Sequence, residues 1–84
     1  MSSNKKLLMK VLSGKHDKSV QFSELQKLLG LLKFELRIRG DHFIYTKPDI
    51  EEIINIQPVN GKAKPYQVKQ IRNLILKYNL GGDL

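Results

Sequence analysis

Two short stretches in which apolar and polar residues alternate, 34–39 and 42–46, flank the pair Gly40-Asp41. Alternation with a period of two predicts half-buried strands. Glycine in the first position of a two-residue loop predicts a type II′ hairpin turn, because glycine reaches positive φ without a steric penalty. The expected cross-strand pairs are Arg39 with His42, Ile38 with Phe43, Arg37 with Ile44, and Leu36 with Tyr45.

This register divides the hairpin into two faces, because side chains that lie opposite each other project from the same side of a sheet. The members of the predicted apolar face are Phe34, Leu36, Ile38, Phe43 and Tyr45. The other face should carry Arg37, Arg39 and His42, together with Ile44. A histidine and two arginines are therefore expected on an exposed sheet surface beside a turn.

Three other stretches have apolar residues at helical spacing. The first covers 5–13. The second begins at Ser23, which with Gln26 forms a capping-box pattern, and ends near Leu32. The third begins at Pro65, a residue that fits the first turn of a helix because its missing N–H costs nothing there. It runs to about residue 79, and the tail from Gly81 is expected to fray.

A third strand is predicted over 53–57, antiparallel to the second, with Ile54 and Ile56 on one face and Asn55 on the other. Residues 50–52 are expected to form a connection. Helices must cover the apolar face of such a sheet while the other face stays wet. The prediction is an α+β fold: a two-layer sandwich of a three-stranded antiparallel sheet with helices on one face, and the first helix at the sheet edge.

Composition sets bounds on the function. The chain has 84 residues, which predicts a single domain over 1–84, and it contains no cysteine, which excludes disulfides and cysteine-ligated zinc. The formal net charge of +7 favours a polyanionic partner, although a basic balance also keeps a small protein soluble. No apolar run approaches the roughly 20 residues that span a bilayer, so no membrane partner and a cytoplasmic location are expected.

The expected open face has a specific chemical capability. The charges of Arg37 and Arg39 disfavour a protonated His42, and a neutral imidazole beside phosphate-binding cations suits RNA transesterification. The helix start flanked by Lys62 and Lys64 is a second candidate phosphate site. On these residues alone, the simpler interpretation is that His42 contacts nucleic acid without performing chemistry.

The segment Gly40-Asp41-His42-Phe43-Ile44-Tyr45 resembles the Gly-Ser-His-x-x-Tyr/Phe signature of the HicA family of mRNA interferase toxins, with Asp41 at the position of the serine. The resemblance extends over 22–80 and leaves the helix over 5–13 as an addition. It implies a core like the double-stranded RNA-binding domain and an endoribonuclease toxin of a type II toxin–antitoxin system. The implied partners are mRNA and a HicB-type antitoxin protein; no DNA binding is expected.

The resemblance also implies roles for individual residues. His42 falls on the catalytic histidine of the motif and Gly40 on its glycine, and no metal or other cofactor is required. The residues expected to bind or guide RNA are Arg37, Arg39, Lys62, Lys64, Lys69 and Arg72.

Two alternatives remain open. A double-stranded RNA-binding module of the same topology would bind RNA by shape without cutting it, and Lys62-Ala63-Lys64 is similar to the basic cluster of such modules. A protein-interaction domain would use its positive surface to bind an acidic partner and would not show salt-dependent RNA binding.

Overall fold

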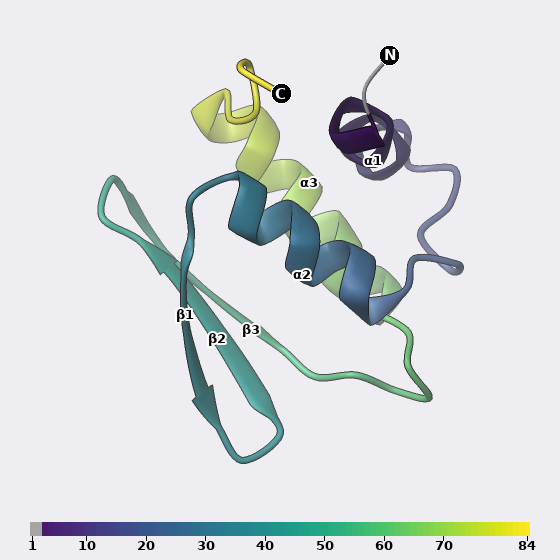
Figure 1. Ribbon diagram of the computed structural model, residues 1–84, viewed down its shortest axis with the longest axis vertical. Coiled ribbons are helices and arrows are strands. Elements are labelled where there is room, and N and C mark those ends of the chain that lie inside the picture. The colour runs from purple at the N-terminus through teal and green to yellow at the C-terminus, as the bar shows by residue number, and fades with distance from the viewer. Residues whose placement is uncertain (1–2) are drawn as a thin grey trace.

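The computed structural model describes residues 3–84, so the first two residues of the predicted domain lie outside the described part. Three helices and three strands follow one another in the order α1 (Ser3–Ser13), α2 (Phe22–Leu31), β1 (Glu35–Arg39), β2 (His42–Lys47), β3 (Ile50–Ile56) and α3 (Pro65–Tyr78). The strands form one antiparallel sheet in the order β1-β2-β3 (Figure 1). The predicted α+β fold is therefore confirmed.

The β1–β2 hairpin has the predicted register. Its Cα partners include Arg39 with His42, Arg37 with Ile44, and Leu36 with Tyr45. Of the two turn residues only Gly40 has a positive φ, +61°, as a type II′ turn requires. Because the turn fixes the register, each side chain of the hairpin lies on the face that the sequence pattern assigns to it.

Strand β3 differs from the prediction at its start. It begins at Ile50 rather than at residue 53, directly after the Pro48-Asp49 turn. Tyr45 pairs with Ile54 but Lys47 pairs with Ile50, so the ladder contains an irregularity between these two pairs. The prediction that 50–52 form a connection is wrong, because this bulge lets the chain re-enter the ladder at once.

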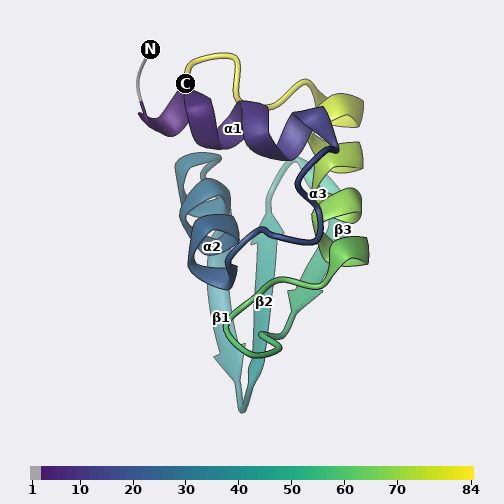
Figure 2. The same ribbon diagram turned by 90° about the vertical axis from the view of Figure 1, so that its right-hand side faces the viewer.

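Helices α2 and α3 lie side by side on one face of the sheet, and together the two layers make the predicted sandwich (Figures 1 and 2). Helix α1 does not pack at the sheet edge as predicted. It crosses α2 and α3 on the side away from the sheet (Figure 2). The reason is its apolar stripe: Leu7, Leu8 and Val11 are all buried, and the helix pair offers them a larger apolar surface than a strand edge.

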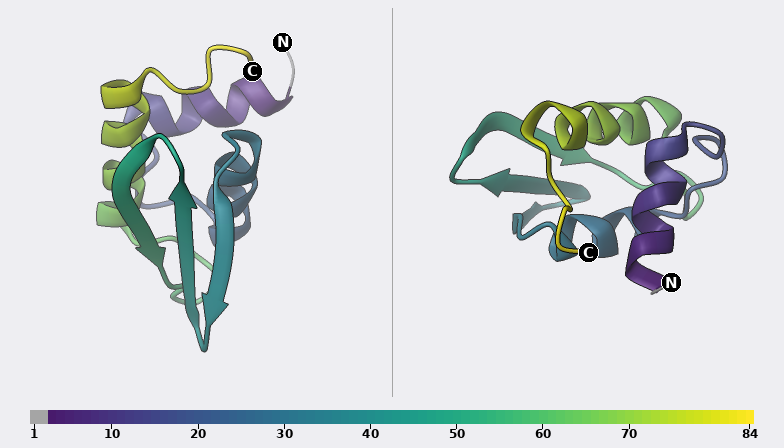
Figure 3. Two further views of the ribbon diagram at one scale, coloured as in Figure 1. Left: turned by 90° about the vertical axis from the view of Figure 1, so that its left-hand side faces the viewer. Right: turned by 90° about the horizontal axis from the view of Figure 1, so that it is seen from above.

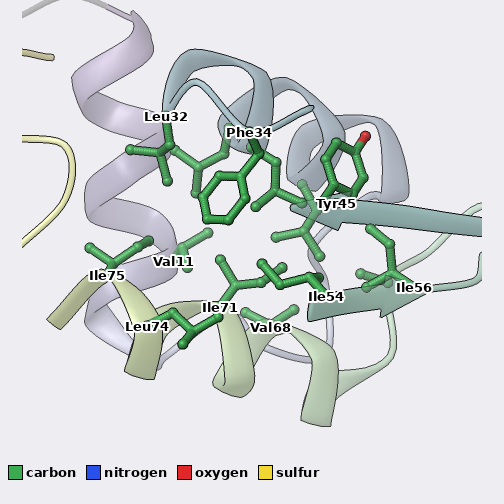
Figure 4. Close-up of a cluster of buried hydrophobic side chains, with 14 of the residues drawn as sticks. Val11, Leu32, Phe34, Tyr45, Ile54, Ile56, Val68, Ile71, Leu74 and Ile75 are labelled. Carbon is green, nitrogen blue, oxygen red and sulfur yellow. The ribbon is translucent and has the colours of Figure 1, made fainter. Parts of the chain in front are cut away.

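The core fills the space between the helices and the strands. Figure 4 shows Val11 of α1 and Ile71 of α3 near Ile54 of β3 and Tyr45 of β2. The tail also joins this core: Leu84 packs against it, and the Leu84 N–H donates to the Gly81 carbonyl at 3.1 Å, so the expected fraying is not observed.

The start of α2 is not the predicted one. The N-cap is Gln21 rather than Ser23, and the Glu24 carboxylate, not Gln26, accepts the Gln21 N–H at 2.9 Å. Burial acts to raise the pKa of Glu24, but the Gln21 N–H and the Lys10 ammonium outweigh it and lower that pKa. Lys10 lies on α1, 3.1 Å from Glu24, so a contact between two helices helps to determine where α2 begins.

Helix α3 begins at Pro65, as the sequence predicts, and its C-cap is Asn79, which has left-handed dihedral angles. Two members of the predicted apolar sheet face are not buried, however. Leu36 is 45% exposed and Ile38 is 54% exposed. Strand β1 is an edge strand, and the hairpin end extends beyond the helices (Figure 2), so the helices do not cover the whole of this strand.

Glu52 links β3 to the end of α3. Its carboxylate accepts hydrogen bonds from the Lys77 ammonium at 2.8 Å and from the Tyr78 hydroxyl at 2.6 Å. These bonds lower the pKa of Glu52 from 4.5 to about 2. The carboxylate therefore stabilises the fold fully above pH 4.5, and this contribution disappears as the pH falls toward 2.

Replacing Glu52 by glutamine is expected to lower the melting temperature at pH 7, and the deficit relative to wild type should shrink between pH 4.5 and about 2. Thermal unfolding followed by circular dichroism across this range measures the effect. Glu51→Gln is the matched control, because Glu51 is an exposed neighbour on the same strand. A deficit that does not change with pH would contradict the expectation.

Candidate nucleic-acid interface

The helices leave one face of the sheet uncovered, and Figure 3 (left) shows this face toward the viewer. We call it the open face. Strand alternation and register assign to it the following side chains: Glu35, Arg37 and Arg39 from β1; His42, Ile44 and Thr46 from β2; Ile53 and Asn55 from β3. Arg37, Arg39 and His42 are exposed there, and Arg39 is the direct Cα partner of His42. The hairpin thus brings these three candidate residues onto one surface.

A small hydrogen-bond network holds the imidazole of His42. Its Nδ1 lies 3.1 Å from Asn55 Oδ1, and its Nε2 lies 3.3 Å from Gln57 Nε2. The Gln57 amide nitrogen also donates to Asp41 Oδ2 at 3.1 Å, which fixes the orientation of this amide because a carboxylate only accepts. The pattern fits a neutral imidazole that donates from Nδ1 to Asn55 and accepts at Nε2 from Gln57.

Asp41 places a carboxylate near the imidazole. Its Oδ1 lies 3.8 Å from His42 Nε2, and both side chains are exposed. In the part of the chain that the structure describes, no hydrogen bond joins Arg37 or Arg39 to His42. The imidazole therefore contacts two amides and lies near a carboxylate, while Arg39 is its cross-strand partner and Arg37 lies two residues before Arg39 on β1.

The loop between β3 and α3 carries Lys62 and Lys64. This loop lies against the start of α2: the Phe22 N–H donates to the Gly61 carbonyl at 2.9 Å. The loop and the hairpin turn lie at the same end of the molecule, the loop on the helix side and His42 on the open face (Figures 1 and 2). Lys64 is the N-cap of α3, and its ammonium lies 5.9 Å from the centroid of the exposed Tyr66 ring.

The two candidate residues within α3 have different surroundings. Lys69 is exposed, whereas the side chain of Arg72 is only 15% exposed. Arg72 Nη1 donates to Asp17 at 2.9 Å and to the Val11 carbonyl at 3.2 Å. This guanidinium ties α3 to α1 and to the loop that follows α1, so the structure does not bring Arg72 to the open face.

Asn55 and Gln57 contact His42, yet sequence reasoning did not select them as site residues. The alternation of the third strand does place both on the face opposite Ile54. Alternation does not predict which β3 residues lie opposite His42, because the register between β2 and β3 depends on the bulge near Lys47. Asp41 was identified as a turn residue, but its link to Gln57 spans 16 positions and appears only in three dimensions.

Two kinds of feature are absent from the described part of the chain. Across residues 3–84, no group of three or more histidine, aspartate, glutamate or cysteine side chains is arranged to hold a metal ion. Within the same range, every helix is too short or too polar to cross a bilayer.

The fold and the site together define a small basic α+β protein with an exposed, hydrogen-bonded histidine on an arginine-bearing sheet. Comparison with known proteins adds no relative to this description: no family model, no curated protein and no solved structure matches the chain.

Proposed function

We propose that this protein is an endoribonuclease that cleaves RNA with His42 as its single proton-transferring residue and without a metal. The observation that carries the proposal is the position of His42. It is exposed beside Arg39, and Asn55 and Gln57 hold its ring with one nitrogen donating and the other accepting. A ring held in this way has an accepting nitrogen, Nε2, and a general base needs such an acceptor.

The chemistry follows from these positions. Nε2 takes the proton of a ribose 2′-hydroxyl when that hydroxyl replaces the Gln57 amide as its partner. The 2′-oxygen attacks the adjacent phosphorus, a 2′,3′-cyclic phosphate forms, the P–O5′ bond breaks, and the leaving 5′-oxygen takes a proton from water. Asp41 Oδ1, 3.8 Å from Nε2, can then pair with the imidazolium. Arg39 and Arg37 stabilise the negative charge that develops on the phosphate.

The substrate class follows from the same step. The nucleophile is the 2′-hydroxyl, which DNA lacks, so RNA is the substrate and DNA is not. Lys62, Lys64 and Lys69 are exposed or partly exposed cations that can guide the RNA backbone toward the hairpin. Arg72, also expected to guide RNA, is paired with Asp17, so the proposal does not use its charge.

The biological setting in this proposal rests on the resemblance of residues 40–45 to the HicA signature. In that setting the protein is the toxin of a type II toxin–antitoxin system, acts on mRNA in the cytoplasm, and is neutralised by a HicB-type antitoxin protein.

Induced expression of wild type and of His42→Ala tests this function. Wild type is expected to arrest growth and to accelerate decay of cellular mRNA, whereas His42→Ala should do neither. His16→Ala is the matched control, because His16 is exposed in the loop after α1 and has no role in the proposal. Equal arrest and equal RNA decay for wild type and His42→Ala would sink the catalytic assignment.

One observation favours a second function, a double-stranded RNA-binding module without chemistry. Lys18, Lys62 and Lys64 line a hollow of about 440 Å³ beside the start of α3. Cations around a helix N-terminus suit phosphate contacts, and such modules use this feature to bind RNA by shape. RNA that stays bound and uncut for hours in EDTA would favour the module over the nuclease.

A further inference from the structure

The open face contains a depression next to the His42 network. It has a volume of about 410 Å³, and its lining residues are Glu35, Leu36, Arg37, Arg39, Ile44, Thr46 and Ile53. Arg39 lines this depression and is also the cross-strand partner of His42, so the depression reaches the residue opposite the histidine. The depression is of the size at which small-molecule sites begin, about 300 Å³ and upward.

We infer that this depression is a nucleobase subsite that selects guanine next to the scissile phosphate of the RNA substrate. The inference rests on the proposed nuclease function and adds to it a base preference and the residue that sets it, Glu35.

The floor of the depression suits a planar base. Ile44 lies on the central strand, and Ile53 lies on β3 with 61% of its surface exposed. Leu36 adds apolar surface at the free edge of β1. Exposed aliphatic side chains that share a small concave surface gain free energy when a flat, weakly hydrated ring covers them. Guanidinium groups such as those of Arg37 and Arg39 also stack on bases.

The charged side chains that line the depression are free to bind a ligand. Among the described residues, no hydrogen bond or ion pair engages the side chains of Glu35, Arg37 or Arg39. Lys10, Lys77 and Arg72, in contrast, each have a carboxylate partner. A carboxylate and two guanidinium groups therefore remain unpaired within one hollow.

Glu35 determines which base fits. A carboxylate only accepts hydrogen bonds, so it prefers an edge that presents two adjacent donors. Guanine presents N1–H and N2–H₂ side by side. The corresponding edges of adenine, cytosine and uracil each place a donor next to an acceptor. Arg37 and Arg39 favour the same base, because arginine donates hydrogen bonds to guanine O6 and N7. Their guanidinium groups can also bind the phosphate of that nucleotide.

Thr46 supports this arrangement. It is the direct Cα partner of Glu35, so its hydroxyl lies on the same face and can donate to the carboxylate or to the base. Ribose and phosphate then extend toward Arg39 and His42, which lie at the turn end of the hairpin.

The test uses four oligonucleotides that are DNA except for one ribonucleotide, rA, rC, rG or rU, and measures the rate of cleavage of each in EDTA. Wild type is expected to cleave the rG oligonucleotide about 5- to 150-fold faster than the others, the range that one bidentate base contact supplies. Glu35→Gln should lose most of this preference, since an amide presents one donor and one acceptor. Glu51→Gln, a change of the same kind outside the depression, should keep it.

A binding measurement that needs no cleavage accompanies this assay. Guanosine 3′-monophosphate is titrated into ¹⁵N-labelled protein, with the adenosine, cytidine and uridine nucleotides as comparisons. Selective shifts at Ile44 and Ile53 that disappear in Glu35→Gln are the expected result.

The outcomes separate this inference from the proposed function. Cleavage at equal rates in all four oligonucleotides would overturn the guanine subsite and leave the nuclease intact. Selective binding of the guanosine nucleotide without any cleavage would support the subsite and overturn the nuclease. Neither binding nor cleavage, or an equal loss of preference in Glu35→Gln and Glu51→Gln, would overturn the subsite.

Discussion

Purified protein with His42 replaced by alanine is expected to cleave RNA about 10²- to 10⁴-fold more slowly than wild type, the usual contribution of one general acid–base residue. The expected loss is large because the proposed mechanism assigns its only catalytic proton acceptor to the His42 imidazole. Asn55 and Gln57 hold the ring but contain amides, which do not take up protons near neutral pH.

Replacing a residue that only holds the imidazole should slow cleavage less than replacing His42 itself. Gln57→Ala removes the amide that occupies Nε2 and leaves the imidazole in place. We expect it to reduce the rate less than His42→Ala does. The matched control is His16→Ala, which should cleave as wild type does. Cleavage rates of a labelled RNA in EDTA measure all four proteins, and a His42→Ala rate within about twofold of wild type would rule out the acid–base role.

Replacing Ile54 by alanine is expected to lower the free energy of unfolding by about 2–5 kcal/mol, the usual cost of a large-to-small change in a core. The Ile54 side chain is 0% exposed and contributes to the cluster between the sheet and helices α2 and α3 (Figure 4). Small domains are marginally stable, with a total of about 5–15 kcal/mol. The variant should therefore be close to unfolding at 37 °C.

The neighbouring residue provides the control. Ile53 lies on the same strand, but its side chain points to the open face and is 61% exposed. Ile53→Ala should change the free energy of unfolding by no more than about 0.5 kcal/mol, as surface substitutions usually do. Urea unfolding followed by circular dichroism measures both variants. Similar losses in the two would mean that β3 does not have the alternating burial described here.

Local sequence determines much of this fold. The pairing across Gly40-Asp41 could be predicted because a two-residue turn leaves one register, and the turn type needs glycine. The start of α3 could be predicted because Pro65 favours the first turn of a helix. The strand alternation placed Arg37, Arg39 and His42 on one face, which is the larger part of the candidate site.

Contacts between distant residues decide the rest. Helix α2 begins earlier than its sequence suggests. The Glu24 carboxylate accepts the N–H of the N-cap residue Gln21 and also binds Lys10 of α1. Arg72 has the sequence pattern of a surface cation, yet it binds Asp17, 55 positions away. The Lys10–Glu24 and Arg72–Asp17 ion pairs span 14 and 55 positions, so neither could be read from spacing.

By itself, then, the sequence determined the hairpin, its two faces and the presence of a histidine beside arginines, because turn chemistry and side-chain alternation act within a few residues. The tertiary structure alone decided what surrounds the histidine. Asn55 and Gln57 reach His42 through the β2–β3 register, which a bulge near Lys47 sets. It also decided that Glu35, Arg37 and Arg39 share a hollow with Ile53, because that arrangement needs three strands in order.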